Sequence, residues 1–437
     1  MLETKWFNKS FEEWIIVEYQ LALASCLLLF CLFANLVDPI TIEDGKSFFS
    51  LLVETIGFLA SLVIIFLCVR VINQRIPTKF SPVLIRLFFL GVAVWLLYCG
   101  NGIYANLTAT GPMSNRHVED AFIGYLTLAA GGLFILTSFG SRHVNVGFVI
   151  SLIVFTVAIL TISLYASREV LWNHQGSLYG IFTRTEVSTG YQISRSSGLA
   201  RMVVVLLFII ITTLMVGHFR HPNIKSSATN LFLGFFATLM VLLLILIQSR
   251  GALLGALISL SFCAFIAAWS RIREVRLRVY LIGGLTSLTT IAAIVLNSLF
   301  IPRFGNSSFL SGWSGRGDIW NAIYLGQENL FLGCGFQCDR VISGNSASNG
   351  LFYAFATGGI LGVATCLAIY SLLILMCIRF GSVITNATEV EIFAWLILPF
   401  LIVRTISESG FLVFGFDLIA TAIASGILFR ALMLQRA

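Results

Sequence analysis

The chain has 437 residues, of which 58% are hydrophobic and only 11% are charged. Soluble globular proteins of this length do not have such a composition, so we expect a helical membrane protein. The formal net charge of +7 does not indicate a nucleic-acid partner, because the basic residues are spread between apolar segments instead of forming a cluster.

Apolar runs recur from one end of the chain to the other. After a short interfacial helix near residues 1–14, their lengths predict about twelve transmembrane helices. The fold class that we expect is therefore an all-α polytopic membrane protein, with residues 1–437 forming a single domain. The predicted spans are 15–37, 47–69, 82–99, 121–139, 144–165, 202–218, 229–247, 252–270, 279–300, 350–377, 390–405 and 411–431.

The basic residues between the spans predict the topology. With the N-terminus in the cytoplasm, 16 of the 27 lysine and arginine residues fall on the cytoplasmic side, including the short RIREVRLR connection at 271–278. The positive-inside rule then favours two cytoplasmic termini. Two long loops lie on the opposite side, at 166–201 and 301–349, and we expect the second to carry short amphipathic helices.

Arginine dominates the basic residues of that opposite side, and arginine is suited to bidentate contact with phosphate oxygens. Arg195 and Arg201 flank a Ser-Ser-Gly sequence, which we expect to form a turn just before a predicted span. Arg250 lies in a tight turn between two spans, among small residues that leave room for a ligand. Each of these arginines either binds an anionic ligand or extends from a helix end to the membrane surface.

Arg316 is the strongest candidate for anion binding. It lies in a Gly/Ser-rich segment directly before an amphipathic run from Asp318 to Phe331. A helix that begins near Asp318 would direct its free N–H groups toward the same region as the guanidinium, which predicts a phosphate site. The alternative is local pairing with Asp318, which could itself be the N-cap. Trp320 and other loop aromatics are suited to stacking on sugar rings.

Several acidic residues have two interpretations. Asp339 and Arg340 are expected to form a structural pair that closes the long loop. Arg404 and Glu408 flank a further external turn, where the carboxylate is either structural or catalytic. Asp417 presents the same two alternatives.

Two cysteines of the long loop, Cys334 and Cys338, are separated by four residues. On a regular helix this spacing gives poor disulfide geometry, so we do not expect a bridge there. The sequence contains no zinc-binding pattern, and we predict neither a metal site nor a cofactor.

The external motifs together resemble the O-antigen ligase and O-antigen polymerase superfamily. The motifs are RSSGLAR, QSRGALLGAL, SGRGDIWNAIYLGQENLFLGCGFQCDR, SNGLFYAFATGGILG and RTISESGFLVFGFD, in this order over residues 190–420. The resemblance implies a GT-C-like glycosyltransferase of the bacterial inner membrane with a periplasmic active site. Its substrates would be an undecaprenyl-diphosphate-linked glycan and an acceptor glycan.

The resemblance also implies roles for individual residues. The arginines that bind the diphosphate would be Arg195 or Arg201, Arg250 and Arg316, with Arg340 and Arg404 as further candidates. Asn349 matches the asparagine of a His-Asn pair, whereas Ser348 stands where the family has histidine. Another group must then act as base, and Glu408 is the first candidate and Asp339 the second.

The leading functional hypothesis is polymerisation of lipid-linked repeat units of a surface polysaccharide by an inverting, metal-independent transferase. Arginine stays charged at any relevant pH and can stabilise the departing diphosphate without a metal ion. The alternatives are a ligase that moves the glycan to lipid A core or to protein, a transporter of lipid-linked sugars, and a non-catalytic assembly scaffold. The partners that we expect are membrane lipids, the two glycans and other polysaccharide assembly proteins.

Overall fold

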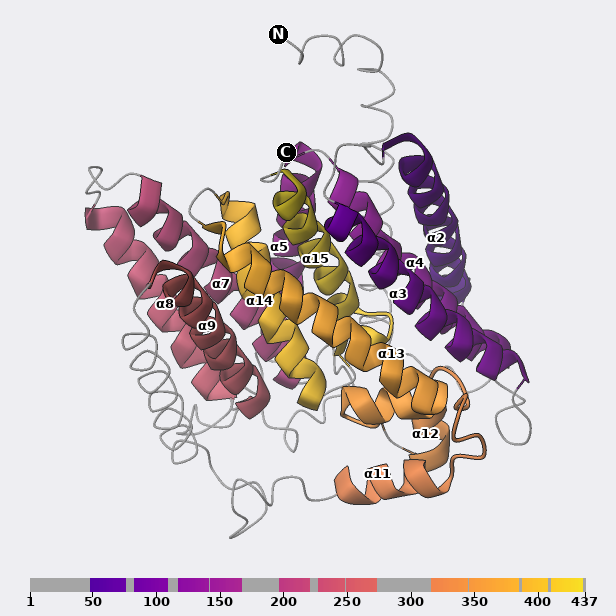
Figure 1. The fold of residues 1–437 in the computed structure, drawn as a ribbon. Coiled ribbons are helices and arrows are strands. Elements are labelled where there is room, and N and C mark those ends of the chain that lie inside the picture. Colours follow the sequence, from indigo (N-terminus) through magenta and orange to yellow (C-terminus); the bar gives the residue numbers. More distant parts are fainter. Residues whose placement is uncertain are drawn as a thin grey trace, which may run out of the picture.

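The computed structural model describes residues 48–75, 82–108, 117–140, 142–166, 196–220, 227–247, 249–272, 316–344, 346–384, 387–407 and 410–434. All regular secondary structure in these segments is helical (Figure 1). The elements are α2 (Phe48–Arg75), α3 (Pro82–Thr108), α4 (His117–Phe139), α5 (Arg142–Ala166), α7 (Ser196–Arg220), α8 (Ser227–Ile247), α9 (Arg250–Arg271), α11 (Arg316–Leu325), α12 (Cys338–Ser343), α13 (Gly350–Gly381), α14 (Glu389–Ser407), η4 (Gly410–Leu412) and α15 (Phe416–Leu434).

The predicted apolar spans from 47–69 to 252–270, and the last three, coincide with long helices. In a bilayer a backbone without water must satisfy its hydrogen bonds internally, and a helix does so. The helices long and apolar enough to cross a membrane include segments of α3, α4, α7, α9, α13 and α15. The predicted spans 15–37 and 279–300 and the interfacial helix at 1–14 lie outside the described residues, so the count of twelve stays a prediction.

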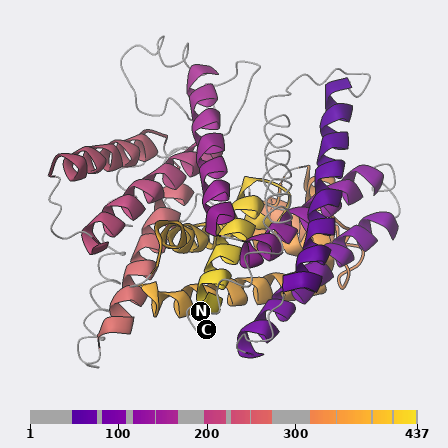
Figure 2. The same cartoon turned by 90° about the horizontal axis from the view of Figure 1, so that it is seen from above.

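Helix α15 lies at the centre of the bundle. Figure 2 shows it between α7, α8 and α9 on one side and α2, α3 and α4 on the other. Nearly every residue of α15 is buried, and its largest contact is with α4. Gly426 permits this contact, because a Cβ atom there would collide with the Thr137 hydroxyl of α4. Small residues of this kind let membrane helices pack closely.

The outer helices expose apolar side chains. On α8, Leu231, Phe232 and Phe235 are 75%, 60% and 63% exposed. So large an apolar surface would be unfavourable in water, and on a helix of this kind it faces lipid. The protein is therefore an all-α membrane protein.

Helix α13 is interrupted at Gly359, where φ is 59° and ψ is −148°. A regular helix would bond the Ile360 N–H to the Ala356 carbonyl, and the next N–H to the Thr357 carbonyl. The break separates these partners and leaves four backbone groups of an apolar helix without their helical bonds. Such groups must find other partners at membrane depth.

The loop between α11 and α12 supplies all four partners. Its carbonyls accept from the two N–H groups after the break, and its N–H groups donate to the two carbonyls before it. The four hydrogen bonds are Ile360 N to Leu330 O (2.9 Å), Leu361 N to Phe331 O (3.3 Å), Cys334 N to Ala356 O (3.0 Å) and Gly335 N to Thr357 O (3.0 Å). The loop backbone is thus built into the helix.

Two asparagines of α3 hold the same loop from the other side. The Asn101 side-chain amide donates to the carbonyls of Leu332 and Gly358, each at 3.2 Å. The Asn106 amide donates to the Phe336 carbonyl at 3.2 Å, and its oxygen accepts from the Phe336 N–H at 2.8 Å. These contacts explain why α3 continues to Thr108, beyond the predicted end of this span at residue 99.

Candidate functional site

The candidate site lies at the end of the bundle where α14 ends and α7 and α15 begin. The helices α11 and α12 lie at the same end, at the bottom of Figure 1. The site has two parts, a buried cluster of charged residues and the segment from Arg316 to Asn349 that packs beside the start of α13.

The charged cluster consists of Arg201 on α7, Arg404 on α14 and Asp417 on α15. The Nη1 atom of Arg201 lies 2.9 Å from Oδ1 of Asp417, and Nε of Arg404 lies 3.0 Å from Oδ2. The Arg404 and Asp417 side chains are only 4% and 5% exposed. A buried carboxylate without a counter-ion would be very unfavourable. The two arginines offset the desolvation cost of burying Asp417.

The three described side chains alone sum to a formal charge of +1, because two guanidinium groups share the Asp417 carboxylate. Arg201 is the more accessible arginine, with 18% of its side chain exposed. Its Nε atom is buried without a hydrogen-bond partner in the described part of the chain. Its guanidinium carbon also lies 5.2 Å from the centre of the Phe416 ring, a cation–π contact that fixes its orientation. Arg201 therefore keeps donors that Asp417 does not use.

The helix ends favour this arrangement of charges. Asp417 lies in the first turn of α15, where the helix dipole stabilises a negative charge. Arg404 lies in the last turn of α14, where the dipole stabilises a positive charge. The cluster therefore follows from where these two helices begin and end.

Helix α11 begins at Arg316 and ends at Leu325, so it is shorter than the amphipathic run that predicted it. Arg316 is the first residue of the helix and does not precede it. Asp318 lies in the first turn and is not the N-cap. The Trp320 indole donates to the Ala347 carbonyl at 2.8 Å, and its ring stacks on Phe352 with centroids 4.7 Å apart. One face of Trp320 is thus occupied, and its observed role is to position the loop.

Asn349 joins the loop to the charged cluster. It is the N-cap of α13, where its side-chain oxygen accepts from the N–H groups of Leu351 (2.9 Å) and Phe352 (3.2 Å). Its amide donates to the Ile406 carbonyl at 2.9 Å, two residues beyond Arg404. The preceding Ser348 has φ 49°, and its hydroxyl donates to the Ser346 carbonyl at 3.3 Å.

Asp339 is buried in α12 and does not form the expected pair with Arg340, whose side chain is exposed. Its Oδ2 accepts instead from the Ala347 N–H at 2.7 Å. Burial raises the pKa of the Asp339 carboxyl, although the Ala347 hydrogen bond and the positive charge of Arg340 act in the opposite direction. A carboxyl with a raised pKa is a better proton acceptor near neutral pH.

Cys334 and Cys338 form a disulfide, with Cα atoms 5.8 Å apart, contrary to the expectation from their spacing. That expectation assumed a regular helix, but α12 begins only at Cys338 and the residues before it form turns. The bridge closes these turns directly beside the interruption of α13.

The structure brings together Arg201 and Arg404 among the predicted arginines. Arg201 lies within α7, because the Ser-Ser-Gly sequence expected to form a turn is the first part of that helix. The partner that sequence reasoning left open is Asp417, and the available signal was an acidic residue inside the predicted span 411–431. Arg250 begins α9, and its side chain lies outside the described atoms, as do Arg195 and Glu408 entirely.

Together the fold and this cluster define an all-α membrane protein with a buried arginine–aspartate–arginine group at one end of its helical bundle. Neither a model of a known protein family nor any curated protein matches the chain. The resemblance to O-antigen ligases and polymerases therefore stays a prediction from the five motifs.

Proposed function

We propose that the protein transfers a glycan from undecaprenyl diphosphate to an acceptor sugar hydroxyl, and that it polymerises repeat units of a surface polysaccharide. The observation that supports this function is the cationic cluster of Arg201, Arg404 and Asp417 at one end of the membrane bundle. A lipid-anchored diphosphate presents its negative charge at this depth, where arginine binds it strongly.

The reaction is a single displacement with inversion. The acceptor oxygen attacks the anomeric carbon, the bond from that carbon to the diphosphate oxygen breaks, and the hydroxyl proton passes to a carboxylate. Negative charge grows on the leaving diphosphate, and donors held in place before the reaction stabilise this charge most effectively. Asp417 would hold the two guanidinium groups in position, and Arg201 would offer its remaining donors to the phosphate.

Two carboxylates are candidates for the base. Glu408 follows directly on Ser407, the last residue of α14, and lies outside the described residues. Asp339 is supported by its raised pKa and by an Oδ1 atom that is buried without a hydrogen-bond partner in the described segments. Arg316 on α11 remains a candidate for the phosphate more distant from the membrane, and Asn349 for positioning the acceptor through the loop.

The disulfide supports an active site on the periplasmic side. Structural disulfides persist in oxidising compartments such as the bacterial periplasm and are rare in the cytoplasm. Cys334 and Cys338 belong to the same segment as Asp339, so their bridge favours exposure of this end of the bundle outside the cytoplasm.

Deletion of the gene, followed by gel analysis of surface glycan, tests the proposal. A polymerase predicts loss of long chains with single repeats still attached, restored by the wild-type gene and not by Arg201→Gln. Full-length glycan left on the lipid carrier would indicate a ligase instead. An unchanged glycan profile would contradict both activities.

A transporter of lipid-linked sugars is the second candidate, because α13 is a broken membrane helix. Transporters often bind substrate at broken membrane helices, whose free backbone groups contact the ligand. Here the four freed groups at Gly359 are bonded by the loop and are not available to a substrate. Purified protein in liposomes separates the two candidates, because a transporter moves labelled lipid-linked sugar between leaflets without lengthening its glycan.

A further inference from the structure

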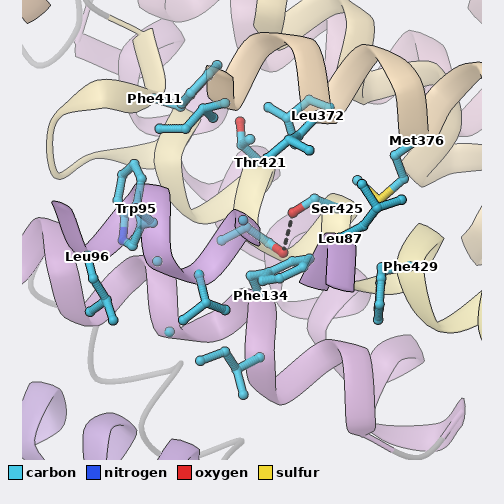
Figure 3. A pocket seen from close by; sticks show the side chains of 18 of the residues that line it. Leu87, Trp95, Leu96, Phe134, Leu372, Met376, Phe411, Thr421, Ser425 and Phe429 are labelled. Carbon is cyan, nitrogen blue, oxygen red and sulfur yellow. Dashed lines mark hydrogen bonds between the residues drawn. The ribbon is translucent and has the colours of Figure 1, made fainter. Parts of the chain in front are cut away.

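An elongated cavity of about 360 Å³ lies among α2, α3, α4, α13 and α15 (Figure 3). Along α3 it is lined from Leu84 to Leu96, and along α13 from Ile369 to Arg379. At about 1.5 Å per helical residue these stretches are roughly 18 and 15 Å long. One leaflet of a bilayer has a hydrocarbon depth of half of about 30 Å, so the cavity matches the length of one lipid chain.

The lining chemistry selects an apolar occupant. Figure 3 shows side chains such as Leu87, Phe134 and Met376 around the cavity. Of the polar groups in the lining, the Ser425 hydroxyl donates to the Ala422 carbonyl at 3.0 Å, and the Cys68 thiol to the Gly132 carbonyl at 3.3 Å. Trp95 Nε1 and the Thr421 hydroxyl are buried in the lining without a hydrogen-bond partner among the described residues. These few groups could not replace the many hydrogen bonds to water that a sugar or nucleotide would lose here, whereas a hydrocarbon chain has no such bonds to lose.

One end of the cavity carries a positive charge. Arg379 lies in the last turn of α13, its side chain is exposed, and no carboxylate of the described residues pairs with it. The lining residue Leu84 lies in the first turn of α3, and the start of α3 is at the top of Figure 1. The Arg201–Arg404–Asp417 cluster is at the opposite end of the bundle, so the charge at Arg379 is separate from the proposed diphosphate site.

We propose that this cavity binds one acyl chain of an anionic phospholipid from the leaflet on the Arg379 side, with the Arg379 guanidinium contacting the lipid phosphate. The guanidinium supplies the charge selectivity, because a net negative headgroup gains more from it than a zwitterionic one. The bound chain fills space between α3, α13 and α15 and so stabilises the packing of these helices. The inference is independent of glycosyl transfer.

Gly91 allows the cavity to be filled without disturbing its walls. A Cβ atom at Gly91 would meet only Leu372 Cδ1, at 3.9 Å, so a side chain can begin here without a clash at Cβ, at a position that lines the cavity. Gly100 is the matched control on the same helix. Its Cβ would meet nothing within 4 Å, and it does not line the cavity.

The full-length protein, purified in detergent, is titrated with phosphatidylglycerol and with phosphatidylcholine of the same acyl chains, and bound lipid is counted by native mass spectrometry. We expect one tightly retained phosphatidylglycerol in the wild type and in Gly100→Leu, and at least a tenfold weaker binding in Gly91→Leu. Arg379→Gln should remove the preference for phosphatidylglycerol. Arg86→Gln, a change of an exposed arginine near the same end of α3, should keep the preference.

Three results would overturn the proposal. The first is equal lipid retention in Gly91→Leu and the wild type. The second is a preference for phosphatidylglycerol that survives Arg379→Gln, which changes an exposed residue and leaves the cavity walls intact. The third is displacement of the bound lipid by stoichiometric undecaprenyl phosphate, which would assign the cavity to the carrier lipid instead.

Discussion

The side-chain amide of Asn349 donates to the Ile406 carbonyl at 2.9 Å, and this hydrogen bond fixes the start of α13 against the end of α14. Arg404 lies two residues before that carbonyl, and its Nε contacts Asp417 at 3.0 Å. The loop that precedes Asn349 is thus linked to the buried charged cluster. A substitution in either part should therefore change the stability of the other.

We expect Asp417→Asn to be strongly destabilising, because it leaves Arg404 buried and Arg201 mostly buried without their negative partner. Breaking a buried ion pair from one side costs about 3–5 kcal/mol. The midpoint of thermal unfolding in detergent, followed by fluorescence-detected gel filtration, measures the effect. A variant as stable as the wild type would show that the cluster does not hold α7, α14 and α15 together.

Arg201→Gln should affect activity more than stability, because Arg201 is the more exposed of the two arginines. Loss of one preorganised donor to a developing oxyanion lowers the rate by about 10²-fold. Arg201→Lys keeps the charge without the planar geometry, so we expect it to retain part of the activity. The measurement is chain lengthening with a purified lipid-linked glycan, and Arg86→Gln at the opposite end is the control. Equal rates for all these variants would exclude Arg201 from the site.

The Cys334–Cys338 bridge should form in cells and contribute modestly to stability. For so short a loop the entropic model gives about 2 kcal/mol. Thiol blocking, followed by reduction and mass labelling of the denatured protein, should show two cysteines that react only after reduction. Cys334→Ser with Cys338→Ser is the matched control, in which this signal disappears. Both thiols reacting before reduction would argue against an oxidising environment for this loop.

Asp339 should make the loop less stable as pH rises. Its pKa is raised in the folded protein, so the folded state keeps a proton that the unfolded segment loses. This contribution to stability is fully present below the ordinary carboxyl pKa of the unfolded segment. It declines as pH rises from that pKa to the raised pKa of the folded protein. Hydrogen exchange of the Ala347 amide across this range measures it. Asp339→Asn should flatten the pH dependence of this exchange. An unchanged slope in that variant would mean that another group causes the pH dependence.

Gly359→Ala should disrupt the junction between α13 and the loop. The residue has φ 59°, and a Cβ atom would lie 2.5 Å from the Leu330 carbonyl oxygen. Strain of this kind costs about 1–3 kcal/mol before any steric overlap is counted. We expect a lower unfolding temperature and reduced yield, with Gly100→Ala, where nothing lies within 4 Å, as the neutral control. A stable Gly359→Ala protein would mean that the interruption adapts readily.

Hydrophobic runs predicted most of the long helices, because apolar length alone decides which segments can cross a membrane. Interactions between distant residues were not predictable in the same way. The asparagines of α3 extend that helix by binding the loop 230 residues away, as in the Asn106–Phe336 pair. Likewise, Asp417 has its partners on two other helices, and nothing local to it distinguishes a paired acid from a catalytic one.

The interleaving of the loop with α13 constrains how the protein is made. A membrane helix normally completes its hydrogen bonds as soon as it leaves the translocation channel, but here two of its turns depend on donors and acceptors from a segment that the ribosome produces earlier, Leu330–Gly335. In the proposed topology, that segment crosses the membrane first and completes these hydrogen bonds only when α13 follows. We therefore expect this end of the molecule to mature late, which leaves an interval in which thiol oxidases on the proposed periplasmic side can act.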